Sequence, residues 1–98
     1  MNLGSLIFEW DKEKARKNQR KHRVSFEEGS TVFGDTLSVT IRDPLHSHAG
    51  EERFVIIGRS STSGRTLVVA FTERGKAMRI ISARPATKQE RTQYEEND

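Results

Sequence analysis

The sequence predicts an α+β fold, in which a small antiparallel sheet has two N-terminal helices and one C-terminal helix (β-α-α-β-β-β-β-α). Two helix-capping motifs precede the middle of the chain, and a third opens near its end. Between them, residues 37–83 hold four segments rich in β-branched and aromatic residues, separated by turn residues. We therefore expect a single domain over residues 1–98, with the helices packed against the sheet.

The chain opens with a predicted strand and a strongly basic helix. Residues 6–10 (LIFEW) are bulky and aromatic, as in a strand, and Asp11 can cap a helix that runs to about Arg23. The least charged stripe of this helix consists of Ala15, Asn18 and His22. Since these positions recur at helical spacing, we expect the helix to dock on the rest of the protein through them.

A second, shorter helix is predicted directly after the first. Ser25 and Glu28 form a capping box, in which each side chain can bind the backbone amide of the other residue. Gly34 is a natural end for this helix. One of its faces carries Phe26, Gly29, Ser30 and Phe33. We expect that face to be buried, because its members share one side of the helix.

The remaining elements follow from hydrophobic periodicity and turn residues. Leu37, Val39 and Ile41 alternate with polar residues, as in a half-buried antiparallel strand. Three further strands are expected at residues 54–57 (closed by Gly58), 66–72 and 77–83 (ended by Pro85), with a hairpin turn at 73–76. Residues 87–90 form another capping box, which opens a C-terminal helix that continues through Tyr94.

Charge is segregated along the chain. The 98 residues include 17 Lys and Arg and 14 Asp and Glu, a net charge of only +3. Residues 12–23 nevertheless hold seven Lys or Arg and one acid, whereas residues 90–98 hold four acids and one Arg. A segregated basic segment favours a polyanion as partner, although a solvated helix face would have the same composition.

Composition excludes several protein classes. The absence of Cys excludes disulfides and thiolate metal sites. No apolar run approaches the roughly 20 residues of a membrane span. The N-terminal segment, with Glu9 and Asp11, does not resemble a signal peptide. We therefore expect a cytoplasmic protein that is not associated with a membrane.

Motifs for metals and cofactors are weak in this sequence. His46 and His48 lie beside Asp43 in a polar loop, but no second, spaced pair of ligands accompanies them. We therefore interpret this segment as an exposed loop rather than a metal site. The sequence also lacks a glycine-rich phosphate loop and a nucleophile elbow, so no nucleotide, flavin or other cofactor is predicted.

Arg79 is a charged residue in the middle of the last predicted strand. Strand alternation places Arg79 and Ile81 on one face, and Met78, Ile80 and Ser82 on the opposite face. A guanidinium at such a position must reach solvent or an anion. Arg84 follows at the end of the strand, and residues 51–53 (EER) lead into another strand. Pairing between these arginines and carboxylates is one interpretation of this charged group.

The other interpretation is phosphodiester chemistry on RNA, whose 2′-hydroxyl is a built-in nucleophile. The reaction then needs a proton acceptor, a proton donor and cations around the phosphorus, but no metal. Arg79 and Arg84 suit the cationic role, since arginine stays charged and binds phosphate bidentately. The candidate proton-transfer groups are His22, Glu52 and Tyr94, and the residues expected to hold the RNA backbone are Lys14, Lys17, Lys21 and Arg53. His22 could equally interact with a helix dipole, and Tyr94 could equally pack in the core.

The chain resembles the BrnT family of toxins over residues 6–96, nearly its whole length. The N-terminal part of the resemblance is carried by Phe8-Glu9-Trp10-Asp11, Lys14, Asn18, Lys21-His22 and Val24-Ser25-Phe26-Glu27-Glu28. The rest is carried by Asp43-Pro44, His46-Ser47, Glu51-Glu52-Arg53-Phe54, Gly58, Arg79-Ile80-Ile81-Ser82-Ala83-Arg84, Ala86-Thr87, Glu90-Arg91 and Tyr94-Glu95. One departure is Arg23, which stands where typical members carry Gly, so the pattern leaves the exit of the first helix open.

The resemblance implies a fold similar to the RelE-type ribonuclease toxins. It also implies a metal-independent endoribonuclease that blocks translation. The implied partner is an antitoxin of the BrnA type, which neutralises the toxin in a complex of two toxins and two antitoxins. Operator DNA would be bound only by the antitoxin, through a ribbon-helix-helix domain.

Two other functions are compatible with the residues. One is a non-enzymatic module that inhibits growth by occupying RNA or a protein. The other is a DNA-binding regulator with a helix-turn-helix, which is disfavoured because Glu27 and Glu28 would face phosphates. For the antitoxin, we expect an acidic or amphipathic segment that covers the basic face and an exposed sheet edge.

Overall fold

The computed structural model describes residues 2–3, 6–48 and 50–96. Its elements are β1 (Asn2–Leu3), β2 (Leu6–Glu9), α1 (Lys12–His22), α2 (Phe26–Thr31), η1 (Val32–Gly34), β3 (Val39–Arg42), η2 (Pro44–His46), β4 (Arg53–Arg59), β5 (Thr66–Arg74), β6 (Ala77–Pro85) and α3 (Lys88–Glu96). The α+β class is confirmed, and the elements follow in the predicted order with the short β1 added before the first predicted strand. The prediction of an antiparallel sheet is only partly correct, because β2 joins it in the parallel direction.

One sheet carries all the strands in the order β1-β2-β6-β5-β4-β3. The four predicted antiparallel strands are present as β3 to β6. The strand at the start of the chain, β2, lies parallel to β6, and Glu9 is the register partner of Arg79. A strand from the start of the chain therefore lies beside the last strand of the chain.

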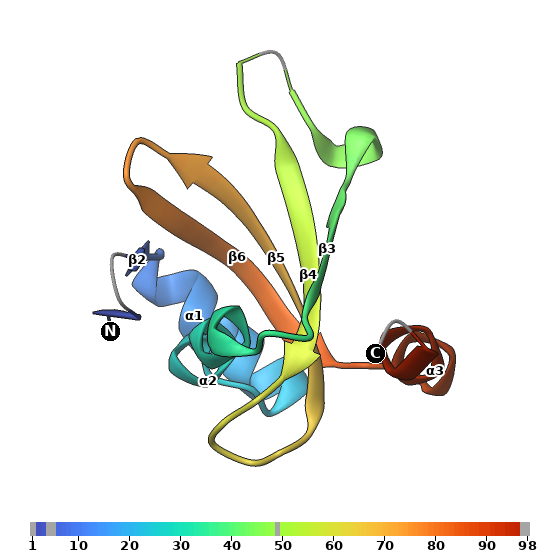
Figure 1. The fold of residues 1–98 in the computed structure, drawn as a ribbon. Coiled ribbons are helices and arrows are strands. Elements are labelled where there is room, and N and C mark those ends of the chain that lie inside the picture. The colour runs from blue at the N-terminus through green and yellow to red at the C-terminus, as the bar shows by residue number, and fades with distance from the viewer. Residues whose placement is uncertain (1, 4–5, 49, 97–98) are drawn as a thin grey trace.

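The helices lie on both faces of the sheet. In Figure 1, α1 and α2 lie on one side of the strands and α3 lies on the other. The α1/α2 face of the sheet carries the main core, whose sheet members include Ile56, Leu67, Val69, Phe71, Ile80 and Ala83. The α3 face carries a smaller cluster formed by Ile57, Val68, Ala86 and Tyr94, with Val55 packed against it. Because α3 covers only part of its face, the rest of that face is available for polar side chains.

Helix α1 docks through the stripe that the sequence predicts. Ala15 packs against the main core, and Asn18 is buried. The Asn18 amide donates to the carbonyl oxygens of Val24 (3.0 Å) and Ala83 (2.8 Å), and its Oδ1 accepts from the Ala83 amide at 3.1 Å. Asn18 therefore ties the basic helix to β6, which explains how so polar a helix holds its place.

The predicted capping residues are present. Asp11 accepts from the Lys14 amide at 2.9 Å, and Ser25 accepts from the Glu28 amide at 3.0 Å. The Glu28 carboxylate, however, turns to Arg65, Ser60 and Ser63 instead of completing the predicted capping box. Burial beside a cation explains this choice, since a carboxylate gains more there than from one exposed amide. The box at residues 87–90 forms in both directions.

The end of α1 falls at Arg23, near the predicted position. Its φ of 59° is left-handed, and it is the one non-glycine residue with positive φ in the described part of the chain. The Arg23 amide donates to the Gln19 carbonyl at 2.9 Å and closes the helix. Arg23 thus takes the helix-ending conformation that glycine adopts most easily.

A β-bulge in β6 changes the predicted pattern of faces. Ala70 pairs with Ser82 and Phe71 pairs with Ile80, so Ile81 is the extra residue. The prediction that Ser82 shares a face with Ile80 is therefore wrong, because Ser82 lies opposite Ala70 on the α3 face. The bulge also places Arg79 and Arg84 on one face, although five residues separate them.

The edge strand β3 is less buried than predicted. Leu37 lies before the strand, and the side chain of Ile41 is 43% exposed. The half-buried alternation expected for this segment is therefore only partly correct, because β3 has a strand on one side alone. No helix within the described residues is both long and apolar enough to cross a membrane.

Candidate active site

A row of four polar side chains crosses the α3 face, one from each of four adjacent strands. Glu9 of β2 is the register partner of Arg79 of β6. Arg79 is in turn the partner of Thr72 of β5, and Thr72 is the partner of Arg53 of β4. Because cross-strand partners point to the same side of a sheet, this row forms a continuous polar strip.

Three members of the strip, Arg53, Thr72 and Arg79, form the floor of a polar hollow of about 180 Å³, which we call the basic hollow. Its lining residues are Lys14, His46, His48, Glu51, Arg53, Thr72, Arg74, Arg79 and Ile81. Among them, four cations face one carboxylate. Three sequence-predicted site residues, Lys14, Arg53 and Arg79, are thus brought together by α1, β4 and β6. The hollow is suited to an anion, since its charges are concentrated over a floor of sheet.

Two arginines of the basic hollow form ion pairs. Arg79 Nη1 lies 2.8 Å from Glu9 Oε2, with 29% of the Arg79 side chain exposed. Arg74 Nη2 lies 3.2 Å from Glu51 Oε2. The arginine–carboxylate pairing considered from the sequence is therefore present for Arg79. It also fixes the guanidinium in place while leaving part of it open to the hollow.

Two buried polar atoms in this floor have no hydrogen-bond partner among the described residues. They are Arg53 Nε and Thr72 Oγ1, and Thr72 is only 3% exposed. Buried donors are rarely left without a partner, because desolvation then costs about 1–3 kcal/mol. Both residues line the basic hollow, although these two atoms themselves are covered.

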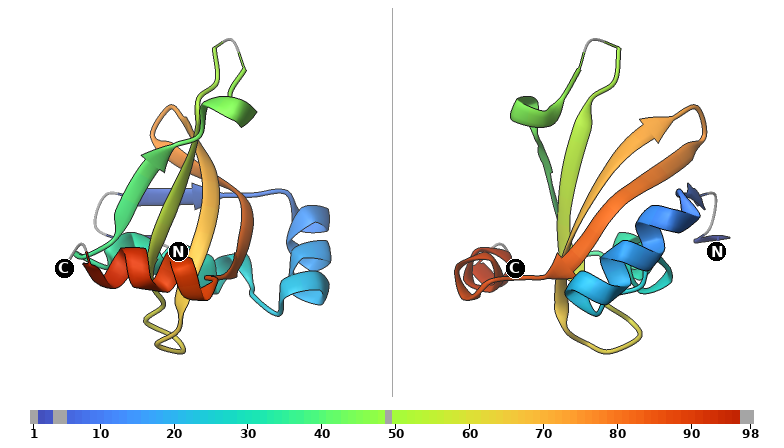
Figure 2. Two further views of the ribbon diagram at one scale, coloured as in Figure 1. Left: turned by 90° about the vertical axis from the view of Figure 1, so that its right-hand side faces the viewer. Right: turned by 180° about the vertical axis from the view of Figure 1, so that it is seen from behind.

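The loop over the hollow is held firmly at its base. The Asp43 amide donates to the Arg53 carbonyl at 2.8 Å. The Ser47 hydroxyl donates to the Asp43 carbonyl at 2.7 Å and accepts from the Arg53 amide at 2.9 Å. His48 and Glu51 form an antiparallel bridge above these bonds. Figure 2 shows η2, which belongs to this loop, at the end of the sheet away from α3.

His46 is paired with a carboxylate in this loop. Its Nδ1 lies 2.9 Å from Asp43 Oδ2. The imidazole lines the basic hollow, whereas the carboxylate behind it is mostly covered. No group of three or more His, Asp or Glu side chains suited to a metal ion was found in the described part of the chain.

Arg84 lies in a different place from Arg79. Both Arg84 Nη atoms are 2.8 Å from the Glu90 carboxylate, in a bidentate pair that joins β6 to α3. This pairing raises the pKa of Arg84 and lowers the pKa of Glu90 to about 2. Five residues of strand separate Arg84 from Arg79 by roughly 16 Å. Arg84 lines another hollow, together with Ile41, Val55 and Gln93.

The predicted proton-transfer residues lie outside the basic hollow. Tyr94 is 6% exposed, and its hydroxyl donates to Asp35 at 2.5 Å. Burial raises the pKa of Asp35, but hydrogen bonds from Tyr94 and from the Arg59 amide outweigh this effect and lower it. Glu52 pairs with Arg42 at 3.0 Å on the surface. Their catalytic roles stay predictions.

The remaining predicted residues lie along α1. His22 is half-buried at the last position of the helix, about 12 Å along its axis from Lys14. Lys17 and Lys21 are exposed and follow Lys14 at steps of three and four residues. They therefore extend from the rim of the basic hollow along one side of the helix.

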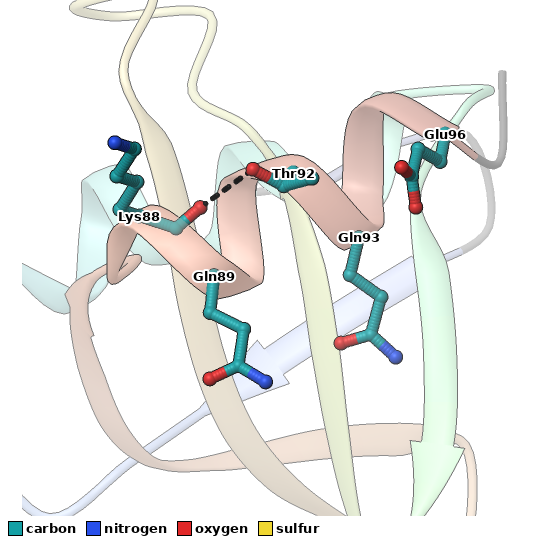
Figure 3. A pocket seen from close by; sticks show the side chains of 5 residues that line it. All are labelled: Lys88, Gln89, Thr92, Gln93 and Glu96. Atoms are coloured by element: carbon teal, nitrogen blue, oxygen red, sulfur yellow. Dashed lines mark hydrogen bonds between the residues drawn. The ribbon is translucent and has the colours of Figure 1, made fainter.

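The broad hollow along α3 does not assemble the predicted site. It measures about 600 Å³ and is lined by Lys88, Gln89, Thr92, Gln93 and Glu96. Figure 3 shows these side chains on one helix, with Thr92 bonded to the Lys88 carbonyl. None of the predicted site residues is among them, so we place the candidate site in the basic hollow.

Sequence reasoning missed several members of the basic hollow. Thr72 carried no signal, since a threonine in an apolar strand is ordinary. Arg74 was interpreted only as part of a hairpin turn. The spacing of Asp43, His46 and His48 indicates at most a weak metal motif. It does not predict that the two histidines line the same hollow as Arg79.

Comparisons with known proteins identify the family of the chain. A search of curated proteins found no significant match. The family model for the ribonuclease toxin BrnT, of type II toxin–antitoxin systems, matches residues 10–90. This match includes the basic helix, the loop over the hollow and the three strands, β4, β5 and β6, that form its floor. The chain therefore belongs to the BrnT family of ribonuclease toxins of type II toxin–antitoxin systems.

Proposed function

We propose that this toxin is a metal-independent endoribonuclease that binds the scissile phosphate of RNA in the basic hollow. The observation that carries the proposal is the gathering of four cations, Lys14, Arg53, Arg74 and Arg79, around one small hollow on the sheet. A phosphate carries negative charge and accepts several hydrogen bonds, so it matches a hollow in which cations outnumber carboxylates.

The proposed reaction uses the 2′-hydroxyl of the RNA. Its oxygen forms a bond to the adjacent phosphorus while the bond from phosphorus to the 5′-oxygen breaks. A base takes the 2′-hydroxyl proton, and an acid supplies a proton to the leaving 5′-oxygen. Arg79 and Arg53 stabilise the extra negative charge that develops on the phosphorus oxygens. The products are a 2′,3′-cyclic phosphate and a 5′-hydroxyl.

The flanking RNA follows α1 in this proposal. Lys14 lines the hollow, and Lys17 and Lys21 continue the line of positive charge along the helix. Lysines contact phosphates as point charges and give affinity without sequence preference. The RNA backbone would therefore leave the hollow along this side of the helix.

The wider biological assignment is also a proposal. A BrnA-like antitoxin would neutralise the toxin in a 2:2 complex and would alone bind operator DNA. Cleavage of RNA in the cytoplasm would inhibit translation. The four-stranded antiparallel arrangement with helices on both faces supports a RelE-like fold.

The proposal is tested by single-turnover cleavage of an RNA oligomer with excess toxin in the presence of a chelator. We expect wild-type toxin to leave cyclic phosphate ends. Arg79→Ala and Arg53→Ala should each lower the rate by about 100-fold or more. Arg16→Ala is the matched control, since Arg16 is an exposed α1 cation paired with Glu13 and does not line the basic hollow.

Two results would contradict the proposal. One is wild-type toxin that leaves RNA intact or cleaves it only with added metal. The other is growth arrest that persists in the Arg53→Ala, Arg79→Ala double variant, which would favour inhibition by occupancy. Thermal unfolding of each variant is measured alongside, so that loss of fold is recognised.

A further inference from the structure

The Asp43–His46 pair has the geometry of a proton-transfer unit. Neither residue is among the proton-transfer candidates predicted from the sequence, which are His22, Glu52 and Tyr94. His46 Nδ1 lies 2.9 Å from Asp43 Oδ2. A carboxylate can only accept, so Nδ1 carries the hydrogen and the lone pair of a neutral ring is on Nε2. The carboxylate therefore fixes both the tautomer and the orientation of the imidazole.

The location of this pair matches the need of the proposed reaction. His46 lines the same hollow as Arg53 and Arg79, whereas His22, Glu52 and Tyr94 do not. The side chain of His46 is 62% exposed, and so can meet a substrate that enters from solvent. The backbone of Asp43 is tied to Arg53 and Ser47, so the loop holds the imidazole relative to the floor.

We propose that His46 is the general base of this site and that Asp43 is its positioning residue. This inference rests on the proposed ribonuclease function and names the group that the proposal leaves unassigned. His46 Nε2 takes the proton of the RNA 2′-hydroxyl as its oxygen bonds to phosphorus. The other histidine of the hollow, His48, has no side-chain hydrogen bond or ion pair among those seen in the described residues.

The charged groups near His46 are those that line the basic hollow. The titratable and charged groups that line it with His46 are Lys14, His48, Glu51, Arg53, Arg74 and Arg79. Because an imidazole acts as a base only when it is unprotonated, cleavage by wild-type toxin should fall as the pH is lowered. His46→Ala should lose that acidic limb, which a merely structural histidine would not produce.

The test compares single-turnover cleavage with binding of an RNA that carries 2′-O-methyl groups and cannot react. His46→Ala should lower the cleavage rate by about 100-fold or more and leave binding of the methylated RNA near wild type. Added imidazole should raise the rate of His46→Ala but not that of Arg79→Ala. Asp43→Asn should lower the rate by at least about tenfold, since the amide no longer enforces one tautomer. Leu45→Ala is the matched control, because Leu45 lies in η2, is 90% exposed and does not line the hollow.

The outcomes separate this inference from the proposed function. If wild-type toxin cleaves RNA, Arg79→Ala does not, and His46→Ala still cleaves at the wild-type rate, the assignment of His46 fails alone. A rate loss in His48→Ala equal to that in His46→Ala would also overturn it, as would loss of binding to the methylated RNA in His46→Ala. If wild-type toxin fails to cleave any RNA, both the inference and the proposed function are overturned.

Discussion

The backbone of Arg23 adopts a strained conformation, which the residues around it in the sequence do not predict. Its left-handed φ of 59° ends α1, and its carbonyl accepts a hydrogen bond from Arg65 Nη2 at 2.8 Å. An L-residue with a side chain pays roughly 1–2 kcal/mol for this region, whereas glycine does not. The backbone bonds around Arg23 hold it there despite that cost.

We therefore expect Arg23→Gly to raise the free energy of unfolding by about 1 kcal/mol. Urea unfolding measures the change. Arg20→Gly is the matched control, since Arg20 is an exposed residue within the same helix. Glycine at that position should lower the free energy of unfolding by about 1 kcal/mol. Two changes of the same sign would contradict the explanation.

At the scale of single elements, the helices were more predictable than the faces of β6. Asp11, Ser25 and Thr87 mark helix starts through contacts only three residues away, so a local pattern is sufficient. The bulge at Ile81 depends on how β6 fits β5, and no residue type in β6 announces it. Strict alternation therefore predicted the face of Arg79 correctly and that of Ser82 incorrectly.

Helix α3 is attached by a bidentate pair that a sequence pattern predicts only in part. The capping box placed Glu90 next to Thr87, but it did not predict that Glu90 would also bind Arg84. Arg84 was predicted from sequence to contact phosphate. That role stays a prediction, and in the structure both Nη atoms of its guanidinium bind the Glu90 carboxylate.

We expect a coupling energy of about 1–3 kcal/mol between Arg84 and Glu90 in a double-mutant cycle of alanine substitutions. The physical reason is that either single variant leaves a partly buried charge without its partner. Thermal or urea unfolding of the four proteins measures the coupling. The exposed Arg42–Glu52 pair is the control, with an expected coupling below about 1 kcal/mol. Additive effects for Arg84 and Glu90 would contradict this account of α3.

At the scale of the whole molecule, a buried carboxylate joins segments far apart in sequence. Glu28 of α2 accepts from Ser60, Ser63 and Arg65, which belong to the connection between β4 and β5. The hydrogen bond from Arg65 is the largest influence, and together with the two serines it overcomes burial and lowers the pKa of Glu28 from 4.5 to about 2. The ionised form is therefore the one that stabilises the fold.

The sign of the pH dependence follows from that shift. Because the pKa of Glu28 is lower in the folded chain, its stabilisation is complete above about pH 4.5 and is lost as the pH falls towards 2. The shift corresponds to at most about 3 kcal/mol. Urea unfolding at pH 7, 5 and 3 should show a gap between wild type and Glu28→Gln that narrows with acidity. Glu13→Gln alters an exposed ion pair, so the difference between its free energy of unfolding and that of wild type should stay nearly constant with pH.

The candidate site could be predicted only in part, because its residues come from segments far apart in the sequence. The residue types came from the sequence, since Arg79, Arg53 and Lys14 stood out by charge and position. Their meeting depends on register between strands and on the parallel pairing of β2 with β6, which local patterns do not specify. The same applies to His46, which reaches the hollow because the loop folds back on Arg53.

The parallel contact between β2 and β6 has a consequence for synthesis of the toxin. Glu9 and Arg79, which form an ion pair, are 70 residues apart in the chain. A nascent chain that has not reached β6 has neither Arg79 nor the central strand that joins β2 to the meander. The ribosome therefore makes most of the chain before the strands that form the floor of the basic hollow can come together.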